Sequence, residues 1–176
     1  MILNNKEKKL FLSQFIRIIT TIIIIYFLDI PIFMKILLIM LIDRIDCGVL
    51  ALRFLLKSEK WIDCDTIIYQ KSDKIIDIIC YTLLLFYIID NGSLSVNYNY
   101  LIILLFIFRL IGLYLFIIKN NRNYLFYFPN FFLEISLILL IIDYFSIFKK
   151  YKLIIILLIF VYKIIFEYYL HYNKKI

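Results

Sequence analysis

Long apolar runs constrain this chain more than any other feature. Of its 176 residues, 65% are hydrophobic, and there are only three Gly and two Pro. The apolar runs lie at about 10–28, 32–56, 70–90, 100–118, 124–148 and 153–170. Each is near the roughly 20 residues that cross a bilayer as a helix, and none alternates as a barrel strand would. The sequence therefore predicts an all-α fold, a polytopic integral membrane helical bundle with about six transmembrane helices.

The six segments are expected to form one transmembrane domain over residues 1–176. Its motif-bearing half spans about 10–90 and its second half about 100–170. The first segment carries no small-residue cleavage site, so we expect it to be retained as a helix rather than removed as a signal peptide. Most Lys and Arg residues fall on one side of this topology, with Lys35 and the lysines at 149–152 as the exceptions. That bias predicts a multi-pass protein with both termini in the cytoplasm.

Two pairs of aspartates lie within or beside apolar segments. Asp43 and Asp46 are three residues apart, and Asp73 and Asp77 are four apart, so each pair lies on one helical face. In the six-helix topology the two pairs come to the same cytoplasmic end of neighbouring antiparallel helices. Carboxylates at membrane depth are costly and usually functional. Four converging carboxylates repel one another unless a hard cation lies between them, which predicts a divalent-cation site.

The residues around these aspartates resemble a known motif. Residues 43–53 read DRIDCGVLALR and residues 73–77 read DKIID. This resembles the CDP-alcohol phosphatidyltransferases, which carry D-x2-D-G-x2-A-R and then G-x3-D-x3-D. Here Gly48 and Ala51 stand one position later than in the family, and Arg53 two positions later. A second register, with Asp73 as the last motif aspartate, is also open.

The resemblance implies a six-helix membrane enzyme that transfers a phosphatidyl group from a CDP-lipid to an alcohol and releases CMP. It implies that Asp77 deprotonates the alcohol. The divalent cation, Mg²⁺ or Mn²⁺, would be held by Asp43, Asp46, Asp73 and Asp77. Contacts to phosphate or nucleotide are expected from Arg17, Gly48, Arg53 and Lys74.

The expected partners follow from composition and from the resemblance. The net charge of +7 belongs to flanks and loops, which favours anionic lipid headgroups over nucleic acid. The partners are therefore membrane lipids, a CDP-lipid donor and a small alcohol acceptor, with a homodimer as an option. The active site is expected on the cytoplasmic side, with the termini.

Two other functions remain open at this point. A catalytically degenerate relative would keep the fold and act as a scaffold or lipid-binding protein, and a small ion or proton transporter would use the aspartates for coupling. The aspartates can also be interfacial charges that pair with neighbouring cations. These cations are Arg44, Arg53, Lys71 and Lys74.

Charged residues in the second half suggest structural roles. Arg109 and Glu134 lie inside the fourth and fifth segments, and we expect them to form an ion pair between helices. Asp143, Lys163 and Glu167 lie nearer segment ends and are expected at the interface. The cysteines have no zinc-type spacing and are expected to be free thiols. They are Cys47, Cys64 and Cys80.

Overall fold

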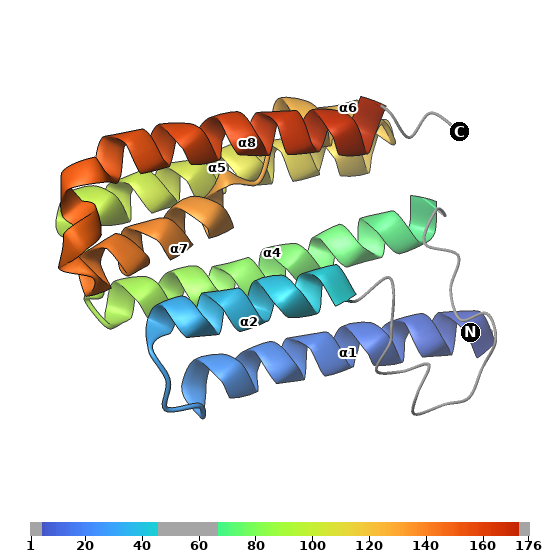
Figure 1. Cartoon of the computed structure of the whole chain (residues 1–176). Helices are drawn as coiled ribbons and strands as arrows, with labels where there is room; N and C mark the ends of the chain where they lie inside the picture. The colour runs from blue at the N-terminus through green and yellow to red at the C-terminus, as the bar shows by residue number, and fades with distance from the viewer. Residues whose placement is uncertain (1–4, 46–66, 173–176) are drawn as a thin grey trace. The chain divides into compact units, whose positions relative to one another are not determined.

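The computed structural model describes residues 5–45 and 67–172 (Figure 1). These residues form helices joined by turns and loops, and they contain no strand. The described residues form two compact units, one up to Leu84 and one from Leu85 onward. The helices are α1 (Asn5–Tyr26), α2 (Ile32–Ile45), α4 (Ile67–Asp90), α5 (Val96–Lys119), α6 (Asn123–Tyr127), α7 (Phe131–Tyr144) and α8 (Lys152–Tyr172), with a 3₁₀ turn η1 (Ser146–Tyr151) before α8.

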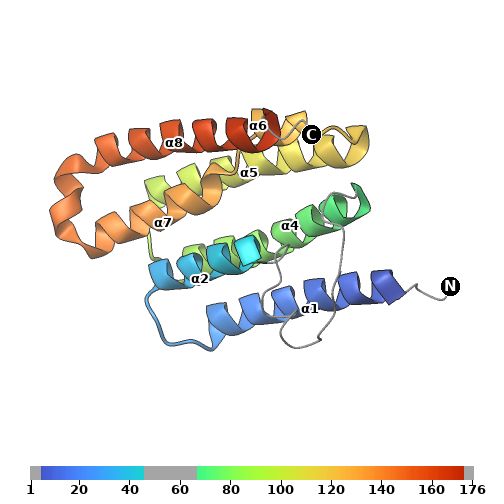
Figure 2. The same ribbon diagram turned by 45° about the vertical axis from the view of Figure 1, so that its right-hand side comes forward.

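In the first unit, α1, α2 and the first part of α4 lie side by side (Figures 1 and 2). Contacts between α1 and α2 link Ile25 with Lys35 and Arg17 with Asp43, so these two helices are antiparallel. Contacts between α1 and α4 link Arg17 with Asp73 and Thr21 with Cys80, so these two run in the same direction. The polar face of α1 therefore contacts α2 and α4 at the same height along the axis of α1.

The turn between α1 and α2 is built by local chemistry. The carbonyl of Pro31 accepts the first helical bonds of α2, from the N–H of Met34 at 2.9 Å and of Lys35 at 3.2 Å. The buried Lys35 ammonium donates to the carbonyl of Ile25 at 2.7 Å. Ile25 belongs to the last turn of α1, where carbonyls lack helical partners and a positive charge is favourable. The turn that the sequence predicts at residues 29–31 is confirmed.

The second unit contains α5, α6, α7 and α8. Within it, α7 packs on α5 and α8, and α6 also contacts both of those helices. The sequence predicts a fifth segment over about 124–148, with a start after Pro129 and Asn130 as the alternative. The structure follows the alternative, because the chain breaks at Pro129 between α6 and α7 and α7 begins at Phe131. Proline has no N–H, so the carbonyl of Leu125 loses its helical donor. The Arg109 guanidinium donates to the carbonyl of Leu125 at 3.2 Å and to that of Phe128 at 2.7 Å.

Arg109 therefore satisfies the carbonyls that the break exposes, and it ties α5 to this connection. The expected ion pair between Arg109 and Glu134 is wrong, because Arg109 donates to backbone carbonyls and Glu134 pairs with Lys163. Pro129 decides this outcome, since a buried carbonyl without a donor is costly.

Two described segments are long and apolar enough to cross a membrane by length and composition, Val96–Lys119 and Asn123–Tyr144. The first includes all of α5, and the second joins α6 and α7 across the break. Leu12–Tyr26 in α1 is apolar but shorter. The prediction of six transmembrane helices is thus met in part, by a helical fold with two candidate spans, and the full count stays a prediction.

Gly112 on α5 generates a stability prediction. A Cβ at this position would collide with the Cβ of Phe128 and lie 2.9 Å from its Cγ. Replacing Gly by Ala inside a helix normally stabilises it by about 1 kcal/mol. We expect Gly112→Ala instead to destabilise the protein by about 1–3 kcal/mol, because the backbone of the connection must shift. Unfolding in mixed detergent–SDS micelles measures the difference.

The matched control is a substitution on the exposed face of the same helix. Leu104 is 63% exposed on α5, and Leu104→Ala should change the free energy of unfolding by less than about 0.5 kcal/mol. A stabilised Gly112→Ala variant would contradict the close approach of α5 to Phe128.

Candidate metal centre

Arg17 is the centre of the polar contacts in the first unit. Its side chain is 3% exposed, on the face of α1 that meets α2 and α4. Nη1 donates to Oδ1 of Asp73 at 2.8 Å, and Nη2 donates to Oδ1 of Asp77 at 2.5 Å and to Oδ1 of Asp43. A guanidinium presents several N–H groups in a planar fork, so one side chain can hold three carboxylates. Arg17 thereby joins the aspartates of α2 and α4.

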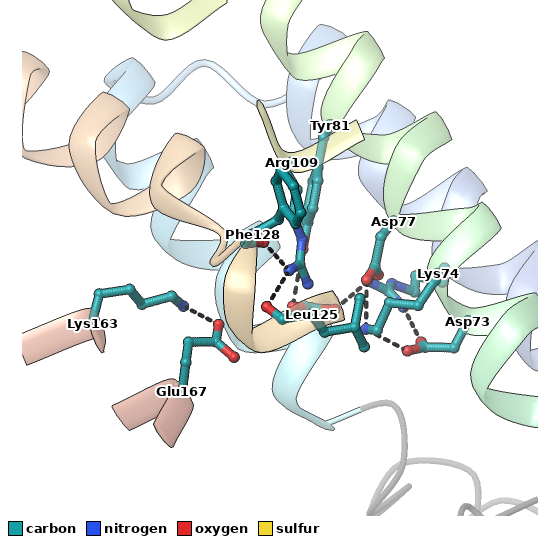
Figure 3. Close-up of polar contacts among 11 residues, drawn as sticks. Asp73, Lys74, Asp77, Tyr81, Arg109, Leu125, Phe128, Lys163 and Glu167 are labelled. Carbon is teal, nitrogen blue, oxygen red and sulfur yellow. Dashed lines mark hydrogen bonds and ion pairs between the residues drawn. The ribbon is translucent and has the colours of Figure 1, made fainter. Parts of the chain in front are cut away.

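Lys74 and Tyr81 bind the remaining carboxylate oxygens. Lys74 Nζ lies 2.7 Å from Oδ2 of Asp73 and 2.6 Å from Oδ2 of Asp77, and Figure 3 shows it bonded to both. The Tyr81 hydroxyl donates to Oδ2 of Asp43 at 3.2 Å. All six oxygens of the three carboxylates therefore have a donor. We call these residues the Arg17 cluster: Arg17, Asp43, Asp73, Lys74, Asp77 and Tyr81.

Helical spacing explains why these side chains meet. Asp73 and Asp77 are four residues apart on α4, and Tyr81 follows after four more, so all three lie along one face. The antiparallel turn between α1 and α2 brings Asp43 level with Arg17. The expected convergence of the aspartate pairs is observed for the three aspartates that the structure describes.

The Arg17 cluster is unevenly exposed. The side chain of Asp77 is 2% exposed, that of Asp73 15% and that of Asp43 26%. Asp43 and Asp73 therefore lie on the more exposed side of the cluster, and Asp77 lies on its buried side.

The three aspartates have the donor set of a divalent-cation site. One carboxylate oxygen from each of Asp43, Asp73 and Asp77 can be chosen so that all lie within 4.8 Å of one another. Carboxylate oxygens are the ligands that Mg²⁺ and Mn²⁺ prefer, and opposite ligands of an octahedral Mg²⁺ lie about 4.2 Å apart. The donors thus fit one hard cation after a small closure.

Three of the expected site residues lie outside the described residues. They are Asp46, Gly48 and Arg53. Among the described ones, Asp43, Asp73, Lys74 and Asp77 come together as expected. Arg17 binds the aspartates themselves, and its expected contact with phosphate stays a prediction.

Sequence reasoning missed two contributors to the first unit. Tyr81 continues the four-residue spacing of Asp73 and Asp77, and that spacing was a usable signal. Thr21, one turn after Arg17 on α1, has its Oγ1 3.5 Å from Sγ of the buried Cys80. Cys80 is a free thiol, as expected.

A second group of buried charges lies in the other unit, on α7 and α8. Lys163 Nζ lies 2.5 Å from Oε1 of Glu134 and 3.3 Å from Oε1 of Glu167, and Figure 3 shows the contact of Lys163 with Glu167. The side chains of Lys163 and Glu167 are 8% and 7% exposed, whereas that of Asp143 is 56% exposed and lies 3.8 Å from Lys149. The expected position of these residues at the membrane interface stays a prediction.

Comparisons with known proteins found no match to this chain among family models, curated proteins or solved structures.

The buried group on α7 and α8 generates a prediction. Lys163→Met leaves Glu134 and Glu167 buried without their shared ammonium, and removing one partner of a buried ion pair typically costs about 3–5 kcal/mol. The same substitution at Lys149, whose pair with Asp143 is more than half exposed, should cost about 0–1 kcal/mol. SDS-induced unfolding of both variants measures the contrast.

A triple variant checks the cause of this effect. Combining Lys163→Met with Glu134→Gln and Glu167→Gln removes all three charges together, so much of the stability should return. Equal losses in Lys163→Met and Lys149→Met would contradict the burial of this group.

Proposed function

We propose that this chain is a multi-pass membrane enzyme that transfers a phosphatidyl group from a CDP-lipid to an alcohol and releases CMP. The observation that carries the proposal is the convergence of Asp43, Asp73 and Asp77, from α2 and α4, around two cationic side chains. The D-x2-D and D-x3-D spacings of the CDP-alcohol phosphatidyltransferases give these aspartates a shared chemical task. Buried carboxylates in so apolar a chain are costly, which favours a functional reason for keeping them.

The reaction breaks one phosphoanhydride bond and forms one phosphoester bond. The alcohol oxygen attacks the phosphorus that bears the diacylglycerol, and CMP leaves with the bridging oxygen. The alcohol loses its proton to a base, and the leaving group gains the electron pair of the broken bond. The site must therefore bind a diphosphate, orient an alcohol and accept a proton.

A divalent cation bound by Asp43, Asp73 and Asp77, with Asp46 as a further carboxylate by sequence, would neutralise the diphosphate and stabilise the charge that develops on CMP. The two cationic side chains of the cluster are suited to bind the remaining phosphate oxygens of the diphosphate. Arg17 offers a fork that matches phosphate oxygens, and Lys74 adds a flexible point charge.

Asp77 is the proposed base, and its bonds impose an order of events. Both of its oxygens accept bonds from cations, at 2.5 Å from Arg17 and 2.6 Å from Lys74. Loss of one of these donors would make an oxygen of Asp77 a better proton acceptor, because each bond to a cation stabilises the ionised carboxylate. Transfer of Arg17 or Lys74 from Asp77 to a phosphate oxygen of the substrate would expose the base when substrate binds.

The membrane location is part of the proposal. Beyond the two candidate spans, α8 also exposes many apolar side chains, which include Leu153, Ile154, Leu157, Leu158, Val161 and Ile165. So large an exposed apolar surface is unusual on a water-soluble protein. We propose six spans with both termini and the Arg17 cluster on the cytoplasmic side.

One observation favours a second function, that of a non-catalytic relative acting as a membrane scaffold or lipid-binding protein. Within the described part of the chain, every oxygen of the three carboxylates already has a donor. A cluster satisfied in this way can hold α1, α2 and α4 together without any ligand. Turnover separates the two functions.

The test is CMP release by purified protein in detergent, with CDP-diacylglycerol, Mn²⁺ or Mg²⁺ and a panel of alcohols. We expect metal-dependent release, and we expect Asp77→Asn to lower it by about 10²–10⁴-fold, the usual contribution of a general base. Asp143→Asn, which changes an exposed aspartate, should release CMP at the rate of the unmodified protein.

Two results would count against the transferase. Release that is unchanged in Asp77→Asn would remove Asp77 as the base. A folded protein that releases no CMP with any acceptor would leave the scaffold function as the better explanation.

A further inference from the structure

Arg17 stands where a cation shared by the aspartates would have to bind. Its Nη2 bonds Oδ1 of Asp77 at 2.5 Å and Oδ1 of Asp43 as well. Oxygen ligands lie about 2.0–2.1 Å from Mg²⁺. A metal ion bridging these two oxygens would therefore overlap with the guanidinium. Arg17 and a metal ion cannot use the same pair of oxygens at once.

The other oxygens give no way around this conflict. Oδ2 of Asp77 and Oδ2 of Asp73 hold Lys74, and Oδ2 of Asp43 accepts from Tyr81. Among the described residues, Arg17 is the one that contacts all three carboxylates. A cation that draws one oxygen from each aspartate would therefore meet a bonded donor at every oxygen, and Arg17 is the described donor common to all three.

Charge leads to the same conclusion. The three carboxylates and two cations of the Arg17 cluster leave one negative charge. Counting these described groups alone, a divalent ion with both side chains in place would leave one positive charge. The guanidinium and the ion are both positive, and like charges at such short range repel strongly.

We propose that Arg17 is a built-in competitor of the metal, which offsets part of the negative charge of the aspartates until a divalent cation replaces it. This rests on the metal site of the proposed function and adds an exchange step to it. The released guanidinium is then available to bind a substrate phosphate. Lys74, which touches two of the aspartates and is 21% exposed, competes more weakly.

The experiment measures Mn²⁺ binding to detergent-solubilised protein, with the metal alone, from the electron paramagnetic resonance signal of free Mn²⁺. Arg17→Gln removes the competing charge, and we expect it to bind Mn²⁺ at least about tenfold more tightly than the unmodified protein. Lys74→Gln should show a smaller gain. Lys71→Gln, one turn earlier on α4, makes the same charge change without a described bond to a carboxylate and should alter affinity by less than about twofold.

Thermal unfolding with and without Mn²⁺ gives a second readout. Arg17→Gln leaves the carboxylates without their main counter-ion, so it should be less stable than the unmodified protein in the absence of metal. Mn²⁺ should then stabilise it more than it stabilises the unmodified protein. If Arg17→Gln does not fold, Lys74→Gln decides, and no gain in its Mn²⁺ affinity overturns the inference.

The outcomes separate this inference from the proposed reaction. Equal or weaker Mn²⁺ binding by Arg17→Gln overturns the competition and leaves the transferase standing. Tighter binding without CMP release by the unmodified protein supports the competition and counts against the transferase. Absence of Mn²⁺ binding in all variants overturns the metal site and the competition together.

Discussion

The first unit depends on one buried guanidinium that binds three carboxylates. Arg17 is the only described side chain that bonds an aspartate of α2 and aspartates of α4 together. Without it, Asp43, Asp73 and Asp77 would repel one another inside an apolar chain, where removing one partner of a buried ion pair is strongly destabilising. The same contacts fix the level at which α1, α2 and α4 meet. The same bonds of Arg17 hold the helices together and form the candidate site. Replacing Arg17 would therefore disturb both the packing of the helices and the site.

Much of the helical layout could be predicted from the sequence, because apolar runs and their interruptions are local signals. The segments predicted at about 70–90, 100–118 and 153–170 correspond to α4, α5 and α8 within a few residues. The break after α5 falls at Asn120, whose left-handed backbone (φ 53°) ends the helix. The meeting of Asp43 with Asp73 and Asp77 could also be predicted, since it needs only helical spacing and short-range adjacency.

The partners of buried charges could not be predicted in this way. Arg109 and Glu134 lie at similar depth in neighbouring segments, which suggested a pair. Pro129, however, exposes a carbonyl that Arg109 satisfies, and Lys163 comes from a helix later in the chain. Arg17 likewise reads as a free phosphate ligand in the sequence, because its bonds to the aspartates depend on how α1 packs. Which charged side chains pair depends on the relative positions of whole helices. The spacing of residues within one segment does not show these positions.

The two groups of buried charge differ in ways that favour the Arg17 cluster as the candidate site. On α7 and α8, one ammonium holds two carboxylates, and no side chain in the group is more than 15% exposed. The Arg17 cluster has a third carboxylate, a second cation and an exposure that reaches 26% at Asp43. An ion pair that only joins helices gains nothing from exposure, whereas a site that binds a diphosphate must be open on one side. Cations that can move from carboxylate to phosphate give such a site a way to limit its net charge when its ligand binds.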